Sequence, residues 1–274
     1  MKNLLKNDFY LLRKNFLFKL LIVLGIIFTA FSILQGVMFS NIGAGKDLPE
    51  NSPGMPGGGN MMVFDTTGKS IFTSSFSISF SFAMIIAVVL ALLVASQFVN
   101  GNVRNKIIAG NKKSTVYFSL ITVHVLAGVV ILLAYSVIRL LFGSLVLGYD
   151  TDATFNSTEF LYALQVLGLS LLVYVAIFSI SVLIATLVRT TGTAILCIIG
   201  FILLLSVTSN IYMLISDWTW LETLCEFNPS NMLNTILESE LSWEQWVIII
   251  SGSIGFSTFA IGGGAYLFSK RDIK

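Results

Sequence analysis

Six long stretches without a charged residue constrain this sequence of 274 residues more than any other feature. They are residues 20–45, 70–103, 114–138, 160–188, 190–216 and 245–269. A helix needs about 20 predominantly apolar residues to cross a bilayer, and each stretch is long enough. Because lipid offers the backbone no hydrogen-bond partner, each stretch must satisfy its own polar groups as a helix. The stretches are too long and too uniformly apolar for the strands of a membrane barrel.

The charge content excludes a soluble globular protein. Charged residues make up 11% of the chain, whereas soluble domains carry about 25%. We therefore predict an all-α polytopic membrane protein, with residues 1–274 as one transmembrane domain. Six spans are expected at about 17–39, 74–99, 116–138, 160–188, 193–215 and 246–268. Outer loops are expected at about 40–72, 139–159 and 217–244.

The distribution of basic residues predicts the orientation. If the spans alternate in direction, 13 of the 16 Lys and Arg residues fall on one side of the membrane. They lie in the N-terminal segment, in the loop after the second span, in the turn after the fourth span and in the C-terminal tail. Positive residues accumulate on the cytoplasmic side, so both termini are expected in the cytoplasm.

Residues 1–16 are expected to form an amphipathic helix at the cytoplasmic interface. Its apolar face combines Leu4, Leu5, Phe9, Leu11, Leu12 and Phe16, and its basic face combines Lys6, Arg13 and Lys14. Such a helix lies flat on the membrane, with its basic residues on anionic headgroups. The two interpretations are a simple anchor and a mechanical element.

The cytoplasmic loop at about 100–115 is expected to meet a partner protein. Residues 102–109 can form two helical turns. Apolar and polar side chains share this segment: Val103, Arg104, Asn105, Lys106, Ile107 and Ile108. Apolar side chains in an aqueous loop favour docking into a groove of another protein. The alternative interpretation is a solvated basic turn.

The stretch NGNVRNKIIAGNKKSTVY resembles the loop between the second and third helices of permease subunits in the type-2 ABC exporter family. The six spans, the large first outer loop, the basic amphipathic start and the tail FSKRDIK are also similar to that family. So is the Asn228–Pro229 step in the loop between the last two spans. The chain departs from the pattern at Gln97 and Asn100, where the family often has an acidic residue, and at Asn102, where Thr is frequent.

The resemblance implies a permease subunit of an ATP-driven exporter in a bacterial cell membrane. It implies that residues 103–108 contact a separate ATP-binding subunit, which holds ATP and Mg²⁺, and that a second permease subunit, identical or different, completes the transporter. The expected substrate is a peptide or another amphipathic molecule.

The chain lacks the G-x-x-x-x-G-K-[ST] phosphate loop, so it is not expected to hydrolyse ATP or to bind a cofactor itself. No nucleic-acid partner is expected. The alternative function is a non-transporting membrane scaffold or sensor.

Polar residues within the spans have two interpretations each. Ser74, Ser77 and Ser81 share one face of the second span, where they either pack against a neighbouring helix or line the translocation path. His124 is expected to be hydrogen-bonded between helices, the alternative being a proton relay. The acidic loop 217–244 is expected to be a solvated outer face or a vestibule for cationic substrates.

Arg139 is the one strong charge beside a span. It lies about 33 Å along the helix from Tyr117 at 1.5 Å per residue, which places it near the outer headgroups. There it is expected to act as an interfacial anchor, or to form an ion pair with Asp150, Asp152 or Glu159. Contact with substrate is the alternative.

Overall fold

The computed structural model describes residues 1–43, 67–76, 82–150, 156–212, 225–238 and 241–270. The described residues fold into helices and contain no β-strand. The helices are α1 (Lys2–Lys14), α2 (Phe16–Gly43), α3 (Gly68–Thr73), the 3₁₀ turn η1 (Ser74–Phe76), α4 (Phe82–Val99), α5 (Asn102–Ile108), α6 (Lys113–Leu147), α7 (Ser157–Val188), α8 (Thr191–Tyr212), α10 (Pro229–Ile236), α11 (Trp243–Thr258), the π-helical segment η2 (Phe259–Gly263) and α12 (Gly264–Lys270).

Six of these helical units are long and apolar enough to cross a membrane. They are Phe16–Met38, Phe82–Val99, Lys113–Leu147, Ser157–Val188, Thr191–Ser209 and Trp243–Lys270. The last unit runs through α11, η2 and α12 without a break. The predicted fold class, an all-α protein with six membrane-spanning helices, is thereby confirmed.

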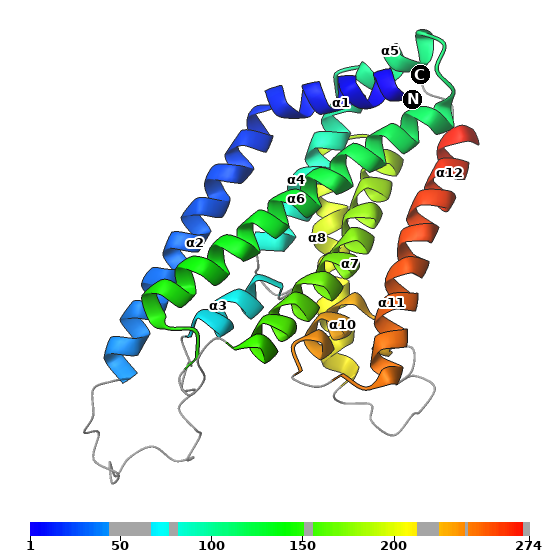
Figure 1. Ribbon diagram of the computed structural model, residues 1–274. Coiled ribbons are helices and arrows are strands. Elements are labelled where there is room, and N and C mark those ends of the chain that lie inside the picture. The colour runs from blue at the N-terminus through cyan, green and yellow to red at the C-terminus, as the bar shows by residue number, and fades with distance from the viewer. Residues whose placement is uncertain (44–66, 77–81, 151–155, 213–224, 239–240, 271–274) are drawn as a thin grey trace, which may run out of the picture.

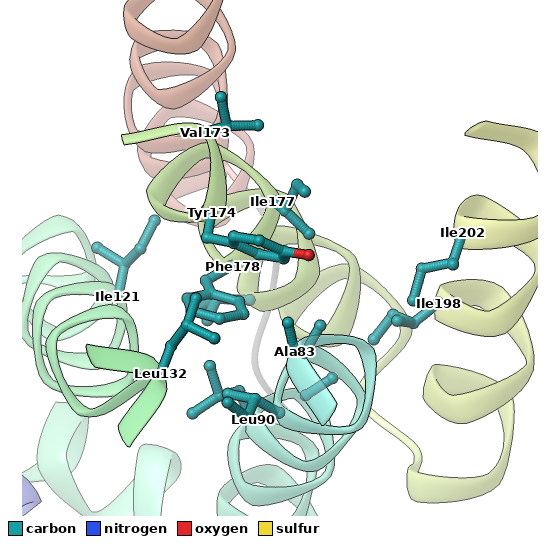
Figure 2. Packing of buried hydrophobic residues seen from close by; sticks show 14 of the residues in the cluster. Ala83, Leu90, Ile121, Leu132, Val173, Tyr174, Ile177, Phe178, Ile198 and Ile202 are labelled. Atoms are coloured by element: carbon teal, nitrogen blue, oxygen red, sulfur yellow. The ribbon is translucent and has the colours of Figure 1, made fainter. Parts of the chain in front are cut away.

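The spans pack around α7 and α4 (Figure 1). In the most apolar window of α7, 61% of the residues are buried inside the protein, against 17% in that of α2. Figure 2 shows Tyr174 and Phe178 of α7 among Leu90 of α4 and Leu132 of α6. Both aromatic side chains are buried, and the Tyr174 hydroxyl donates a 2.9 Å hydrogen bond to the carbonyl oxygen of Phe76. The helix α2 therefore leaves most of its apolar surface to lipid.

The described part of the second span begins at Phe82, later than the expected residue 74. The preceding residues form a separate short helix, α3, whose N-terminus is closed by a capping box between Thr67 and Ser70. This helix packs closely on α6, because a Cβ atom added at Gly68 would lie 2.6 Å from the backbone nitrogen of Ser144. Of the serines expected on one face, Ser74 lies in η1, and Ser77 and Ser81 lie outside the described residues.

The third span continues beyond its expected end at 138, so that Arg139 lies within α6 and not in a loop. Eight apolar or small residues follow Arg139 and extend the helix to Leu147. The helix ends before Gly148, which has a φ of +80°. Residues with a side chain rarely adopt this backbone conformation, whereas glycine adopts it readily. A single charge was therefore a poor marker of the end of this span.

The two ends of the bundle differ. The helices α1 and α5 and the C-terminal end of α12 lie at one end, which we call the α1/α5 end, and α3 and α10 lie at the other (Figure 1). At the junction of α1 and α2, Asn15 adopts an extended conformation and its side-chain oxygen accepts a 2.9 Å hydrogen bond from the Leu17 backbone. The chain therefore turns from the lateral helix α1 into the first span at this residue.

The orientation inferred from the basic residues is tested by cysteine labelling in intact cells. In a background where the free cysteines Cys197 and Cys225 are replaced by serine, a membrane-impermeant maleimide is expected to label Asn234→Cys from outside. Lys112→Cys should be labelled only after the cells are permeabilised. Both residues are exposed and lie at opposite ends of the bundle. External labelling of residue 112 would contradict the predicted orientation.

Candidate functional site

A buried ionised side chain sits at the centre of the α1/α5 end. Leu4, Asp8 and Leu12 follow one another at intervals of four residues, and they are the buried residues of α1. This spacing places them on one face of the helix. The Asp8 side chain is fully buried, with a relative exposure of 0%. A buried carboxylate is stable only if other groups pair with it and bond to it.

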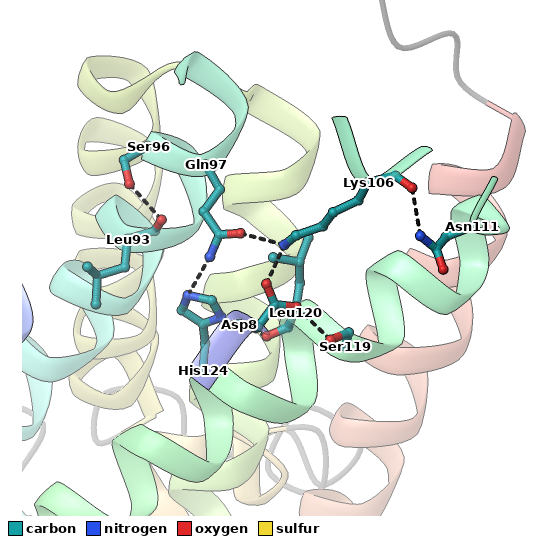
Figure 3. A network of polar contacts seen from close by, with 9 residues as sticks. All are labelled: Asp8, Leu93, Ser96, Gln97, Lys106, Asn111, Ser119, Leu120 and His124. Atoms are coloured by element: carbon teal, nitrogen blue, oxygen red, sulfur yellow. Dashed lines mark hydrogen bonds and ion pairs between the residues drawn. The ribbon is translucent and has the colours of Figure 1, made fainter. Parts of the chain in front are cut away.

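The partner of Asp8 is Lys106 of α5, which lies 98 positions later in the sequence (Figure 3). The Lys106 ammonium forms an ion pair with the Asp8 carboxylate and donates a second hydrogen bond, of 2.9 Å, to the side-chain oxygen of Gln97. The other carboxylate oxygen of Asp8 accepts a 2.6 Å hydrogen bond from the Ser119 hydroxyl. Both charges therefore keep polar partners although they are removed from water.

His124 continues the network toward the membrane interior. Its Nε2 lies 3.4 Å from the Gln97 amide nitrogen, and its Nδ1 lies 2.7 Å from the Leu120 carbonyl oxygen. The side-chain oxygen of Gln97 already accepts from Lys106, so its amide nitrogen is the donor to Nε2. The imidazole proton then lies on Nδ1, which donates to Leu120. The interpretation of His124 as a histidine bonded between helices is confirmed, since Gln97 belongs to α4 and His124 to α6.

The network joins α1 to three consecutive helices that follow much later in the sequence, α4, α5 and α6. Asp8 comes from α1, Gln97 from α4, Lys106 from α5, and Ser119 and His124 from α6. Removing one member of a buried ion pair leaves the other charge uncompensated, which typically costs about 3–5 kcal/mol. The pair therefore fixes the position of α5 relative to α1, α4 and α6.

The structure divides the residues expected to contact a partner into two groups. Val103 and Lys106 are buried within the chain itself, so they are not available to another protein. Ile107 is half-buried, whereas Arg104, Asn105 and Ile108 are exposed. Ile108 is 71% exposed, so its large apolar side chain is open to contact by a partner. The free surface of α5 is thus a mixed apolar and polar face.

A second contact connects the start of α6 to the last span. Tyr117 lies in the first turns of α6, and its buried hydroxyl donates a 2.7 Å hydrogen bond to the carbonyl oxygen of Ala260. Ala260 belongs to the π-helical segment η2, where the usual helical hydrogen-bond pattern is interrupted. A Cβ atom added at Gly264 would lie 1.9 Å from this hydroxyl. The tyrosine therefore fits only because residue 264 is a glycine.

Arg139 is not placed as the sequence suggested. Its side chain is 6% exposed, and its guanidinium donates hydrogen bonds of 2.8 Å to the Tyr135 hydroxyl and of 2.8 Å to the Ser74 hydroxyl. The expected ion pair with Asp150 or Glu159 is wrong, because both carboxylates pair with Lys69. The third expected partner, residue 152, lies outside the described residues.

The Lys69 cluster fastens α3 to the start of α7. The Lys69 ammonium lies 3.0 Å from the Glu159 carboxylate and 3.6 Å from that of Asp150. Partial burial lowers the pKa of Lys69, but the hydrogen bond and charge of Glu159 and the charge of Asp150 outweigh it, so the pKa is raised. These carboxylates stabilise α3, and they do not form a metal site: within the part of the chain that is described, no group of three His, Cys, Asp or Glu residues could hold a metal ion.

Sequence reasoning missed the role of Asp8, although a signal was present. Asp8 is the one acidic residue in an N-terminal segment rich in lysine and arginine, and it interrupts the apolar stripe between Leu4 and Leu12. An acidic residue on the buried face of an amphipathic helix needs a cationic partner. The partner was not deducible, because Lys106 is one of several lysines in the facing loop.

Comparison with protein-family models and with curated proteins finds no match for this chain. The resemblance to exporter permeases therefore rests on the residues quoted above.

The Asp8–Lys106 pair predicts a non-additive pattern of stability. Asp8→Ala and Lys106→Ala are each expected to lower the free energy of unfolding by about 3 kcal/mol, because each leaves a buried charge unpaired. The double variant should lose much less than the sum. Thermal and denaturant unfolding in detergent measures this. The control Arg104→Ala removes an exposed charge from the same helix and should change stability little. Additive losses would show that the two residues act independently.

The contact between Tyr117 and η2 predicts a difference between two glycines. Gly264→Ala is expected to destabilise the protein by about 1–3 kcal/mol, because the new methyl group overlaps the tyrosine. Gly262→Ala should be nearly neutral, since nothing lies within 4 Å of its added Cβ atom. Tyr117→Phe should cost about 1 kcal/mol through the lost hydrogen bond. Equal melting temperatures for the two alanine variants would refute this account.

Proposed function

We propose that this chain is the membrane-spanning subunit of an ATP-driven exporter, and that α5 is the element through which a separate ATP-binding subunit acts on it. The observation that carries the proposal is the surface of α5. Ile108, Arg104 and Asn105 are exposed on one side of the helix. Val103 and Lys106 are buried on the side that packs against the rest of the chain. An exposed apolar residue on a firmly anchored short helix suits a contact that must transmit force.

The energetics favour a partner at this surface. Burying an isoleucine side chain is worth about 1.5–3 kcal/mol. On α5 the exposed Ile108 would gain this free energy in a groove of another protein, since the described part of its own chain leaves it uncovered. The neighbouring polar residues Arg104 and Asn105 suit the rim of such a contact.

The contacts inside the α1/α5 end support a mechanical role. A push on α5 would act on α1 through the Asp8–Lys106 ion pair and on α4 and α6 through Gln97 and Ser119. It would act on the last span through the hydrogen bond from Tyr117 to Ala260. In the proposed cycle, closure of the ATP-binding subunits moves these helices together and opens the path for substrate to the opposite side.

The partner subunit would bind ATP and Mg²⁺, because this sequence has no G-x-x-x-x-G-K-[ST] phosphate-binding loop. A second permease subunit, identical or different, would complete the transporter in the bacterial cell membrane, with both termini of each subunit in the cytoplasm. The proposed substrate is a peptide or another amphipathic molecule.

The test is a substitution on the exposed face of α5. Ile108→Asp places a carboxylate where an apolar contact is proposed, and it is expected to abolish co-purification of the ATP-binding subunit or to uncouple ATP hydrolysis from transport. Asn105→Asp is the control, because it adds the same charge at an exposed neighbouring position. Both variants should insert and melt like the natural chain, since neither residue is buried.

Each result has a defined meaning. Normal binding and transport by Ile108→Asp would show that α5 is not the coupling element. If the purified chain recruits no ATP-binding subunit at all, the alternative function of a non-transporting scaffold or sensor is favoured.

A further inference from the structure

An apolar groove runs between α2 and α6. Its volume is about 280 Å³. It is lined from α2 by Leu21, Gly25 and Ile26, and from α6 by Val130, Ala134 and Tyr135. Phe82 also lines the groove, and its ring centroid lies 4.5 Å from that of Tyr135. Both helices are membrane spans, so the groove lies at the depth of the lipid acyl chains.

Next to this groove lies a buried cation that has no carboxylate partner among the described residues. The Arg139 side chain is 6% exposed, and within the described part of the chain it bonds to the neutral hydroxyl groups of Tyr135 and Ser74. Its Nε is buried without a hydrogen-bond partner. Among the described residues no carboxylate forms an ion pair with it. Removing a guanidinium from water without a neighbouring anion costs free energy. An anion bound at Arg139 would offset that cost.

Tyr135 joins the two features. This residue lines the groove, its hydroxyl accepts the hydrogen bond from Arg139, and the guanidinium carbon lies 5.2 Å from the centre of its ring. On α6 the groove is lined from Val130 to Ile138, and Arg139 is the next residue of the helix. From Val130 to Arg139 the helix rises about 14 Å at 1.5 Å per residue. This is about half of the 30 Å hydrocarbon core of a bilayer. The distance therefore matches one leaflet, with the cation at its headgroup end.

We propose that this groove is a binding site for an anionic phospholipid, with the phosphate at Arg139 and one acyl chain between α2 and α6. Guanidinium groups bind phosphate through strong charge-assisted hydrogen bonds. A free phosphate ion would leave the apolar groove unfilled. A peptide would bring backbone polar groups that the apolar lining cannot satisfy. The site does not depend on the proposed transport function.

The experiment uses the full chain in vesicles that contain a trace of phosphatidylglycerol with a photoreactive diazirine in the middle of one acyl chain. After illumination, label is expected on peptides of α2 and α6 that line the groove. Arg139→Gln should reduce this labelling about tenfold, the change typical of losing one charge-assisted contact. Arg139→Lys retains the charge and should restore part of it.

A second pair of variants tests the groove without touching Arg139. Ala134→Phe fills the groove from an exposed position of α6 and should also reduce labelling. Leu133→Phe is the matched control, because Leu133 is exposed on the same helix but does not line the groove. It should leave labelling unchanged. Elution on size exclusion verifies that each variant is folded.

Three outcomes overturn the proposal. Equal labelling of Arg139→Gln and the natural chain would show that the arginine has another counter-ion. Unchanged labelling of Ala134→Phe would show that no acyl chain occupies the groove. Displacement of the label by inorganic phosphate alone would make the site a phosphate site and not a lipid site.

Discussion

The ion pair between Asp8 and Lys106 is the interaction on which the arrangement of the α1/α5 end depends. Both charges are removed from water, so neither is tolerated without the other. The pair brings together a helix that precedes the first span and a helix that follows the second. It therefore does more than hold two side chains: it determines that the surface helix α1 packs against the bundle and presents Leu4 and Leu12 to it. The exposed face of α5 is defined by the same contact.

The sequence predicted the large features because they follow from hydrophobicity alone. Six uncharged stretches are sufficient to identify six spans, since the cost of a charge in lipid is large and local. The amphipathic segment at the start also forms a helix. Boundaries were less predictable. The start of the apolar run 70–103 belongs to the separate short helix α3, which begins at a capping box and packs on α6 through Gly68, and such contacts depend on tertiary packing.

The candidate site was predictable only in part. The short helix after the second span was expected, and its exposed residue Ile108 agrees with that expectation. The buried half of the helix was not predicted. In the sequence, Lys106 resembles any solvated lysine, and its role becomes visible only when the structure places Asp8 beside it. The same reason explains Arg139, whose supposed carboxylate partners are bound by Lys69. Charges within a membrane protein select partners by three-dimensional proximity, and sequence spacing carries little of that information.

The length of α6 has a consequence of its own. With 35 residues it measures about 52 Å, whereas a bilayer with its headgroups is about 40–45 Å thick. A straight helix of this length fits only when inclined by roughly 30° or more, as the long diagonal course of α6 in Figure 1 illustrates. Its two ends carry α5 and α3. A change in bilayer thickness would alter the inclination of α6 and displace its two ends in opposite directions. The thickness of the surrounding membrane would therefore affect the positions of α5 and α3 at the two ends of the bundle.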